Sequence, residues 1–123
     1  MNHRSQAISE VSGSKCISLT TFKRDGTKVS TPIWFNVIDG KIYVTTEPSA
    51  WKVKRIAKNP SVEFAVCTQR GKVTGKTFAG TARLLAPVEL AAVIAAKKRR
   101  YLSFRLIHLF KQDQVAIEIT PNA

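Results

Sequence analysis

The chain has 123 residues, a formal net charge of +12 and a hydrophobic fraction of 44%. This length suits a single domain with one core, and no apolar run approaches the roughly 20 residues needed to cross a bilayer. The serine-rich start lacks the apolar segment of a secretion signal. We therefore expect a cytoplasmic protein with no membrane span, a flexible arm over residues 1–14 and one domain over residues 15–123.

The excess of 20 Lys and Arg over 8 Asp and Glu creates a strongly positive field. Such a field attracts anions, which include nucleic acids, anionic membranes and phosphorylated cofactors. Cys16 and Cys67 have no neighbours at metal-ligand spacing, so we expect free thiols and no metal site.

The first half of the chain predicts two antiparallel hairpins that together make a meander. A strand over residues 17–23 ends at the turn signal Asp25-Gly26. Strands over residues 28–38 and 41–46 follow, and a second Asp-Gly pair at 39–40 separates them.

A change of hydrophobic period then indicates a short basic helix over residues 50–58. Val53 and Ile56 recur at helical spacing. Ser49 is a suitable N-cap, and Asn59-Pro60 ends the helix.

The second half of the chain alternates between strand and helix patterns. The expected elements are strands over residues 61–69, 76–85 and 114–120, and helices over residues 88–98 and 101–111. Gly80 is expected to mark a bulge or bend in its strand. The whole pattern predicts a mainly β (α+β) fold, a six-stranded antiparallel barrel with short helices.

The strongest candidate site lies where the third strand ends and the basic helix begins. Thr45 and Thr46 supply hydroxyls there, and Lys52, Lys54 and Arg55 lie in the first turns of the helix. A helix N-terminus offers free N–H groups and a positive partial charge, and hydroxyls and cations complete a phosphate cradle. The alternative is an ordinary solvated basic helix face, which is the commoner role of such residues.

Two other segments are candidate ligand contacts. Pro32 cannot donate to a sheet ladder, so it marks a strand edge or bulge where neighbouring backbone groups are free for a ligand. Trp34 and Phe35 point to opposite faces, so that one packs in the core while the other borders a cofactor ring, or else both pack in the core. The loop over residues 70–76 carries three cations, and it either approaches an anionic ligand or partner chain or is a mobile exposed loop.

The sequence contains no Ser-His-Asp set, no Cys-His pair, no paired carboxylates and no glycine-rich phosphate motif. We therefore predict no catalytic side chain. If the protein is an enzyme, a cofactor carries the chemistry.

Several stretches, in this order and spacing, resemble the pyridoxamine 5'-phosphate oxidase-like split-barrel superfamily, and most closely its deazaflavin (coenzyme F-420)-dependent oxidoreductase branch. These stretches are residues 17–35, 39–46, 52–60, 80–85 and 115–120. The resemblance implies an FMN-binding type of split β-barrel that forms a homodimer, with cofactor sites at the dimer interface. The positions that match cofactor-binding residues of the family are Pro32, Ile33, Trp34, Thr45, Thr46, Lys52, Lys54, Arg55, Arg70 and Lys76.

The resemblance also implies an activity. It is that of an oxidoreductase which transfers a hydride between coenzyme F-420, or FMN as the second choice, and a small organic acceptor. The strand with Pro32, Ile33 and Trp34 is expected along the ring of the cofactor, and Arg70 and Lys76 are expected to act from the second subunit. The alternative is a non-enzymatic basic barrel that binds single-stranded nucleic acid.

Overall fold

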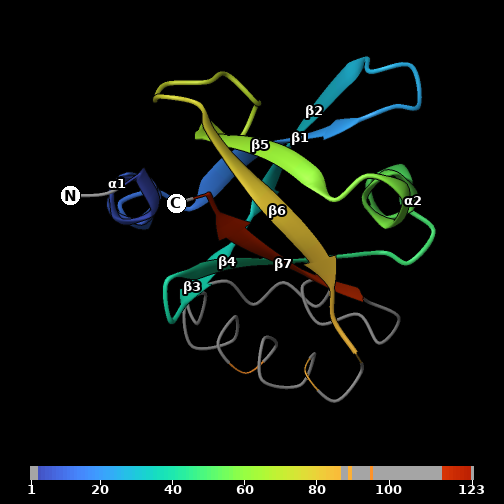
Figure 1. The fold of residues 1–123 in the computed structure, drawn as a ribbon. Helices are drawn as coiled ribbons and strands as arrows, with labels where there is room; N and C mark the ends of the chain where they lie inside the picture. The colour runs from blue at the N-terminus through green and yellow to red at the C-terminus, as the bar shows by residue number, and fades with distance from the viewer. Residues whose placement is uncertain (1–2, 87–88, 90–94, 96–114, 123) are drawn as a thin grey trace.

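The computed structural model describes residues 3–86, 89, 95 and 115–122 (Figure 1). In these residues the elements, in chain order, are α1 (His3–Ser12), β1 (Cys16–Phe22), β2 (Lys28–Trp34), β3 (Asn36–Ile38), β4 (Lys41–Thr46), α2 (Trp51–Lys58), β5 (Ser61–Val66), β6 (Phe78–Leu84) and β7 (Val115–Pro121). None of the helices in this part of the chain is long and apolar enough to cross a bilayer. The helices expected over residues 88–98 and 101–111 lie outside the described residues, apart from positions 89 and 95.

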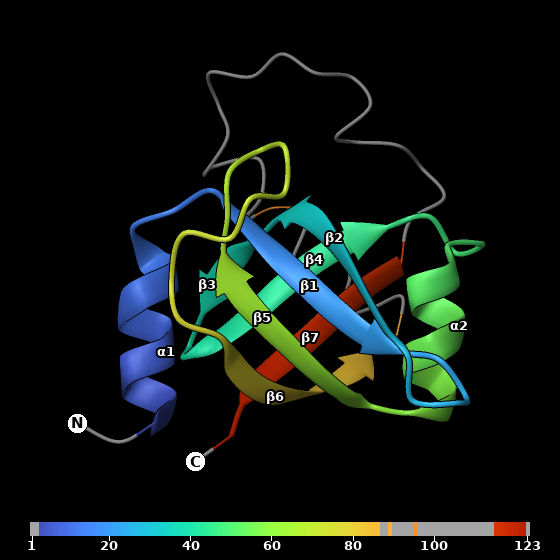
Figure 2. The same cartoon turned by 90° about the horizontal axis from the view of Figure 1, so that it is seen from above.

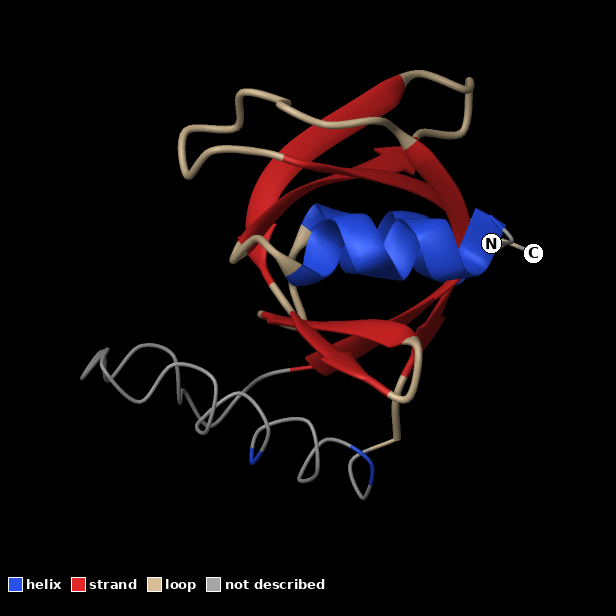
Figure 3. Ribbon diagram, turned by 90° about the vertical axis from the view of Figure 1, so that its left-hand side faces the viewer, coloured by secondary structure: helices blue, strands red, loops and turns tan. Residues whose placement is uncertain are grey.

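The strands form one sheet in the order β2-β1-β5-β6-β7-β4-β3, and neighbouring strands are antiparallel. The sheet curves into a barrel, and Figure 3 shows α1 lying across one of its ends. This confirms the predicted mainly β split-barrel fold class.

The strand count differs from the prediction because the expected strand over residues 28–38 is broken at Phe35. This side chain is buried in the core. On one side of it β2 pairs with β1, and on the other side β3 pairs with β4. The two pieces therefore occupy opposite edges of the sheet, so the predicted hairpins both form but do not lie side by side as a meander.

The two Asp-Gly turns behave as their sequences predict. Asp39 and Gly40 have φ values of 51° and 76°, and positive values at both positions are what a two-residue type I′ hairpin requires. In the first turn, the Asp25 carboxylate accepts a hydrogen bond from the Thr27 N–H at 3.0 Å. These turns set the registers of the two hairpins.

The hydrophobic core fills the barrel. Inward-facing residues alternate with outward-facing ones along the strands, as Ile42 and Val44 do on β4. The buried core residues are Ala7, Val11, Ile17, Leu19, Phe35, Ile42, Val44, Ile56, Val62, Phe64, Phe78, Ala82, Ile117 and Ile119.

Helix α1 occupies most of the segment expected to be a flexible arm. Ala7 and Val11, which are four residues apart on one helix face, are fully buried against the core. Arg4 Nε donates a hydrogen bond to the Pro121 carbonyl at 3.0 Å. The sequence analysis missed this helix because its apolar stripe is narrow and the rest of the segment has the composition of a polar tail.

Gly80 lies in a regular part of the sheet, not at the expected bulge, since it pairs with Val62 on one side and Pro121 on the other. A glycine is needed there because a Cβ would approach the Thr120 carbonyl oxygen to 2.9 Å.

We expect Gly80→Ala to lower the free energy of unfolding by about 1–3 kcal/mol. Urea denaturation measures this change, and Gly13→Ala is the control because nothing lies within 4 Å of its Cβ position. Equal stability of the two variants would refute this explanation.

Candidate functional site

Helix α2 covers the end of the barrel opposite α1 (Figure 2). Val53 and Ile56 face the core. The expected N-cap, Ser49, is wrong: Ala50 occupies the cap position, with φ −61° and ψ 141°, and its side chain makes no capping hydrogen bond. The first turn is therefore left without a side-chain acceptor from its own cap, which leaves its positive end open to an anion.

Lys52 and Arg55 are three residues apart and lie on the same side of α2. Both are half-buried. Arg55 Nη1 contacts the buried Thr21 hydroxyl of β1 at 3.4 Å. Burial, and then the neighbouring positive charge of Arg55, lower the pKa of Lys52. Among the residues that the structure describes, no carboxylate forms an ion pair with either cation.

Lys54 is not part of this pair. Its Nζ lies 4.4 Å from the centre of the Trp51 ring, a cation–π distance. Trp51 is 67% exposed. The contact occupies the solvent side of α2, so the three cations predicted to act together are divided between two faces.

The two threonines at the end of β4 also lie on opposite faces of the sheet. Alternation along β4 places Thr46 on the core-facing side with Val44, and Thr45 on the outer side. Thr45 pairs with Ala116, and Thr46 pairs with Val115 on β7. Thr46 is thus the one of the two hydroxyls on the inner face of the sheet. We call Thr46, Lys52 and Arg55 the α2 corner.

The β2 residues lie on an edge of the sheet, as the proline predicted. Pro32 is exposed and pairs with Ser18, whereas Ile33 packs against the core. Trp34, on the same face as Pro32, is half-buried. Of the two adjacent aromatic residues, Phe35 is the one that enters the core.

The loop that carries Arg70 folds back over this edge strand. It is closed by hydrogen bonds between Thr68 and Lys72. At Gly71, which has a φ of +93°, a Cβ would lie 3.6 Å from Cδ of Pro32. The exposed Arg70 is therefore adjacent to the β2 edge.

Lys76 is at the other end of the barrel. Its N–H donates to Glu10 of α1 at 3.2 Å, and its Nζ lies 5.5 Å from the centre of the Phe78 ring. Figure 2 shows α1 and α2 at opposite ends. Within one chain, Lys76 and the α2 corner are thus separated by the length of the barrel.

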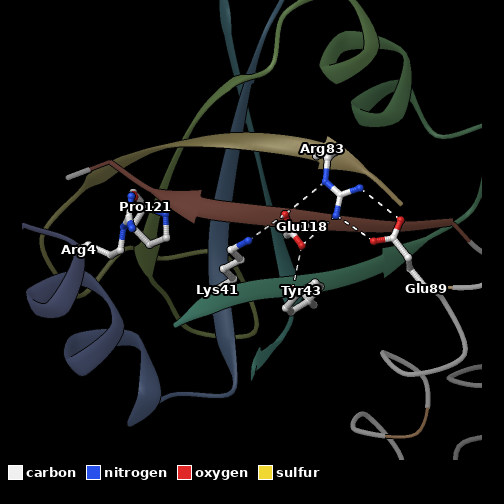
Figure 4. Close-up of polar contacts among 7 residues, drawn as sticks. All are labelled: Arg4, Lys41, Tyr43, Arg83, Glu89, Glu118 and Pro121. Atoms are coloured by element: carbon white, nitrogen blue, oxygen red, sulfur yellow. Dashed lines mark hydrogen bonds and ion pairs between the residues drawn. The ribbon is translucent and has the colours of Figure 1, made fainter. Parts of the chain in front are cut away.

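A polar row on the outer face of the sheet escaped the sequence analysis (Figure 4). It crosses four strands, through the pairs Asn36–Tyr43, Tyr43–Glu118 and Glu118–Arg83. Tyr43 donates to Glu118 at 2.9 Å, and Arg83 contacts both Glu118 and Glu89. Within the described residues, the buried Asn36 Oδ1 has no hydrogen-bond partner. The sequence feature that could have indicated this row is Glu118, an acidic residue within the largely apolar strand β7.

The row carries a pH dependence that can be measured. Burial and the hydrogen bond to Glu118 raise the pKa of Tyr43 from 10.0 to about 12. A pKa that is higher in the folded state gives stability that is present below pH 10 and is lost as pH rises towards 12. We expect Tyr43→Phe to be about 1–2 kcal/mol less stable at pH 7, and to lose less stability than the wild type between these two pH values. Identical pH profiles in urea denaturation would contradict the assignment.

Comparison with known proteins places the chain in a family. The sequence model of a family described as pyridoxamine 5'-phosphate oxidase matches residues 5–123. No curated protein matches the chain.

Solved structures show the same fold. A conserved hypothetical protein from Mycobacterium tuberculosis is 23% identical, with a TM-score of 0.76 over 100% of this chain and 82% of its own. The heme storage protein HutZ from Vibrio cholerae is 18% identical, with a TM-score of 0.73 over 100% and 92% of the two chains. A putative pyridoxamine 5'-phosphate oxidase from Listeria innocua is 13% identical, with a TM-score of 0.72 over 99% and 95%.

Proposed function

The chain belongs to the pyridoxamine 5'-phosphate oxidase family, and on that premise we propose that it is an oxidoreductase that binds a flavin-type cofactor, either coenzyme F-420 or FMN. The α2 corner holds the phosphate of the cofactor. The edge strand β2 lies along its ring. The substrate is a small organic acceptor.

The observation that carries this proposal is that two half-buried cations, Lys52 and Arg55, lie side by side on α2 with no carboxylate paired to either among the described residues. Lys52 and Arg55 repel each other, and burial further disfavours the charge on Lys52. A phosphate dianion bound between them removes the repulsion and accepts charge-assisted hydrogen bonds. The uncapped N-terminus of α2 adds to the attraction. The residues present therefore fit a phosphorylated ligand.

The position of the ring follows from the β2 edge. Pro32 has no N–H to offer a neighbouring strand, so this edge is protected against further sheet pairing. The half-buried Trp34 supplies an aromatic surface on the same face, and flat rings stack on such surfaces. Arg70, beside Pro32, adds positive charge for an anionic group of the ligand.

The bound cofactor supplies hydride transfer, and the chain supplies binding and orientation. Lys52, Arg55 and Thr46 fix the phosphate, which anchors the ring against β2. A second copy of the chain completes the site in the proposed homodimer and brings Lys76 from the partner to the cofactor. This arrangement gives a function to Lys76, which contacts α1 and not α2 within its own chain.

The proposal is tested by ligand titration. FMN, coenzyme F-420, riboflavin and a labelled single-stranded oligonucleotide are titrated separately into the purified protein at two salt concentrations. Riboflavin has the ring of FMN without its phosphate, so we expect FMN to bind at least about tenfold more tightly. Binding of the oligonucleotide that weakens steeply with salt, together with no binding of either cofactor, would favour the nucleic-acid alternative instead.

A further inference from the structure

The fold brings together the only two cysteines of the sequence. Cys16 begins β1, and Cys67 follows the last residue of β5. Ile17 pairs with Val66, so the same register places the two cysteines opposite each other. The Cys67 N–H donates to the Cys16 carbonyl at 3.2 Å, and the two Sγ atoms are 3.6 Å apart.

This geometry is close to that of a disulfide. Directly opposed residues in an antiparallel pair have Cα atoms about 4.5–5.5 Å apart, within the range of about 4.4–6.8 Å seen in disulfides. The sulfur atoms must approach to about 2.05 Å, which rotation of the two side chains can achieve without separating the strands.

The surroundings of the two thiols favour a disulfide within the chain over a disulfide with another molecule. Both thiols are buried, so neither is accessible to a bulky thiol or to another chain. Burial and the hydrogen bond to Cys16 raise the pKa of Cys67 to about 12, so little thiolate is present at neutral pH. The pair lies at the end of the β1–β5 ladder, and Cys67 is beyond its last regular pair. Local opening of this end would expose the sulfurs to water and to a small oxidant, and would allow the attacking thiolate to form.

We propose that Cys16 and Cys67 are a redox modification site at which a hydroperoxide converts the dithiol reversibly into an intramolecular disulfide. One thiolate attacks a peroxide oxygen, the O–O bond breaks, and a sulfenic acid and hydroxide form. The second thiol then displaces water and forms the S–S bond. For hydrogen peroxide, the two thiols lose two electrons and two protons, and two water molecules result.

The bond would join β1 to the base of the loop that carries Arg70. Cys16 pairs with Trp34 on β2, and Cys67 forms a bridge with Val73 at the base of that loop. The modification therefore lies directly beside the strand on which the proposed cofactor ring rests. Its formation requires no cofactor, so its test is independent of the proposed function.

Peptide mapping of the wild-type protein tests the site. The reduced, folded protein is treated with hydrogen peroxide, alkylated under denaturing conditions and digested with trypsin. We expect an intact mass about 2 Da lower and a crosslinked peptide that joins residues 16–23 to residues 59–70. Dithiothreitol should restore both thiols.

Cys16→Ser and Cys67→Ser are matched controls, and each should lose the mass decrease and the crosslink. The wild-type peptide decides the result even if a variant folds poorly. Three outcomes would overturn the proposal: both thiols remain free for alkylation, they oxidise to sulfinic acid without a crosslink, or the crosslink joins two chains.

Discussion

Lys52→Ala is expected to raise the Kd for FMN by about 10- to 150-fold, because a charge-assisted hydrogen bond is worth about 1.5–3 kcal/mol. Lys52 is half-buried beside Arg55, without a carboxylate to neutralise it among the residues that the structure describes. The bound phosphate would therefore be its principal anionic partner. Fluorescence titration at constant ionic strength measures the change.

Lys58→Ala is the matched control. Lys58 lies on the same helix and carries the same charge, but it is exposed and belongs to the last turn. Its removal changes the net charge equally and should change the Kd less than about twofold. Equal losses of affinity in the two variants would mean that diffuse positive charge alone attracts the ligand, and that the α2 corner is not its binding site.

Phe64→Ala is expected to lower the free energy of unfolding by about 3–5 kcal/mol. The Phe64 side chain is 1% exposed, and its ring stacks on Phe78 with a centroid separation of 5.9 Å. The two rings come from neighbouring strands β5 and β6 that pair at these residues. The truncation leaves a cavity that β5 and β6 cannot close by approaching each other, because the hydrogen-bonded ladder fixes the distance between them.

Trp51→Ala provides the comparison for this loss. It also removes a large aromatic side chain, but one that is 67% exposed on α2. We expect a change within about 0.5 kcal/mol, as for most surface substitutions. Guanidinium denaturation of both variants measures the difference. A loss below about 1 kcal/mol for Phe64→Ala would show that this part of the core can collapse around the missing ring.

Turn chemistry and local periodicity explain what the sequence could predict. Asp39-Gly40 determines a two-residue hairpin by itself, so β4 has the predicted bounds. The period of Val53 and Ile56 is also local information, and α2 differs from its prediction by one residue. The resemblance predicted the superfamily to which the chain belongs.

Features that depend on distant residues were missed. The break at Phe35 arises because β2 and β3 pair with strands at opposite edges of the sheet, and no local pattern records this. The partners of Glu118 became visible only when the register placed Tyr43 and Arg83 beside it. The division of Lys54 from Lys52 depends on how α2 rotates against the core, which a count of basic residues does not reveal.

The central claim is that the α2 corner holds the phosphate of a flavin-type cofactor. A crystal structure of the protein with FMN tests it most directly. The account predicts phosphate density within about 3 Å of Lys52 Nζ and the Arg55 guanidinium, with the ring against Pro32 and Trp34. Density for FMN elsewhere, with Lys52 and Arg55 free of the ligand, would contradict it.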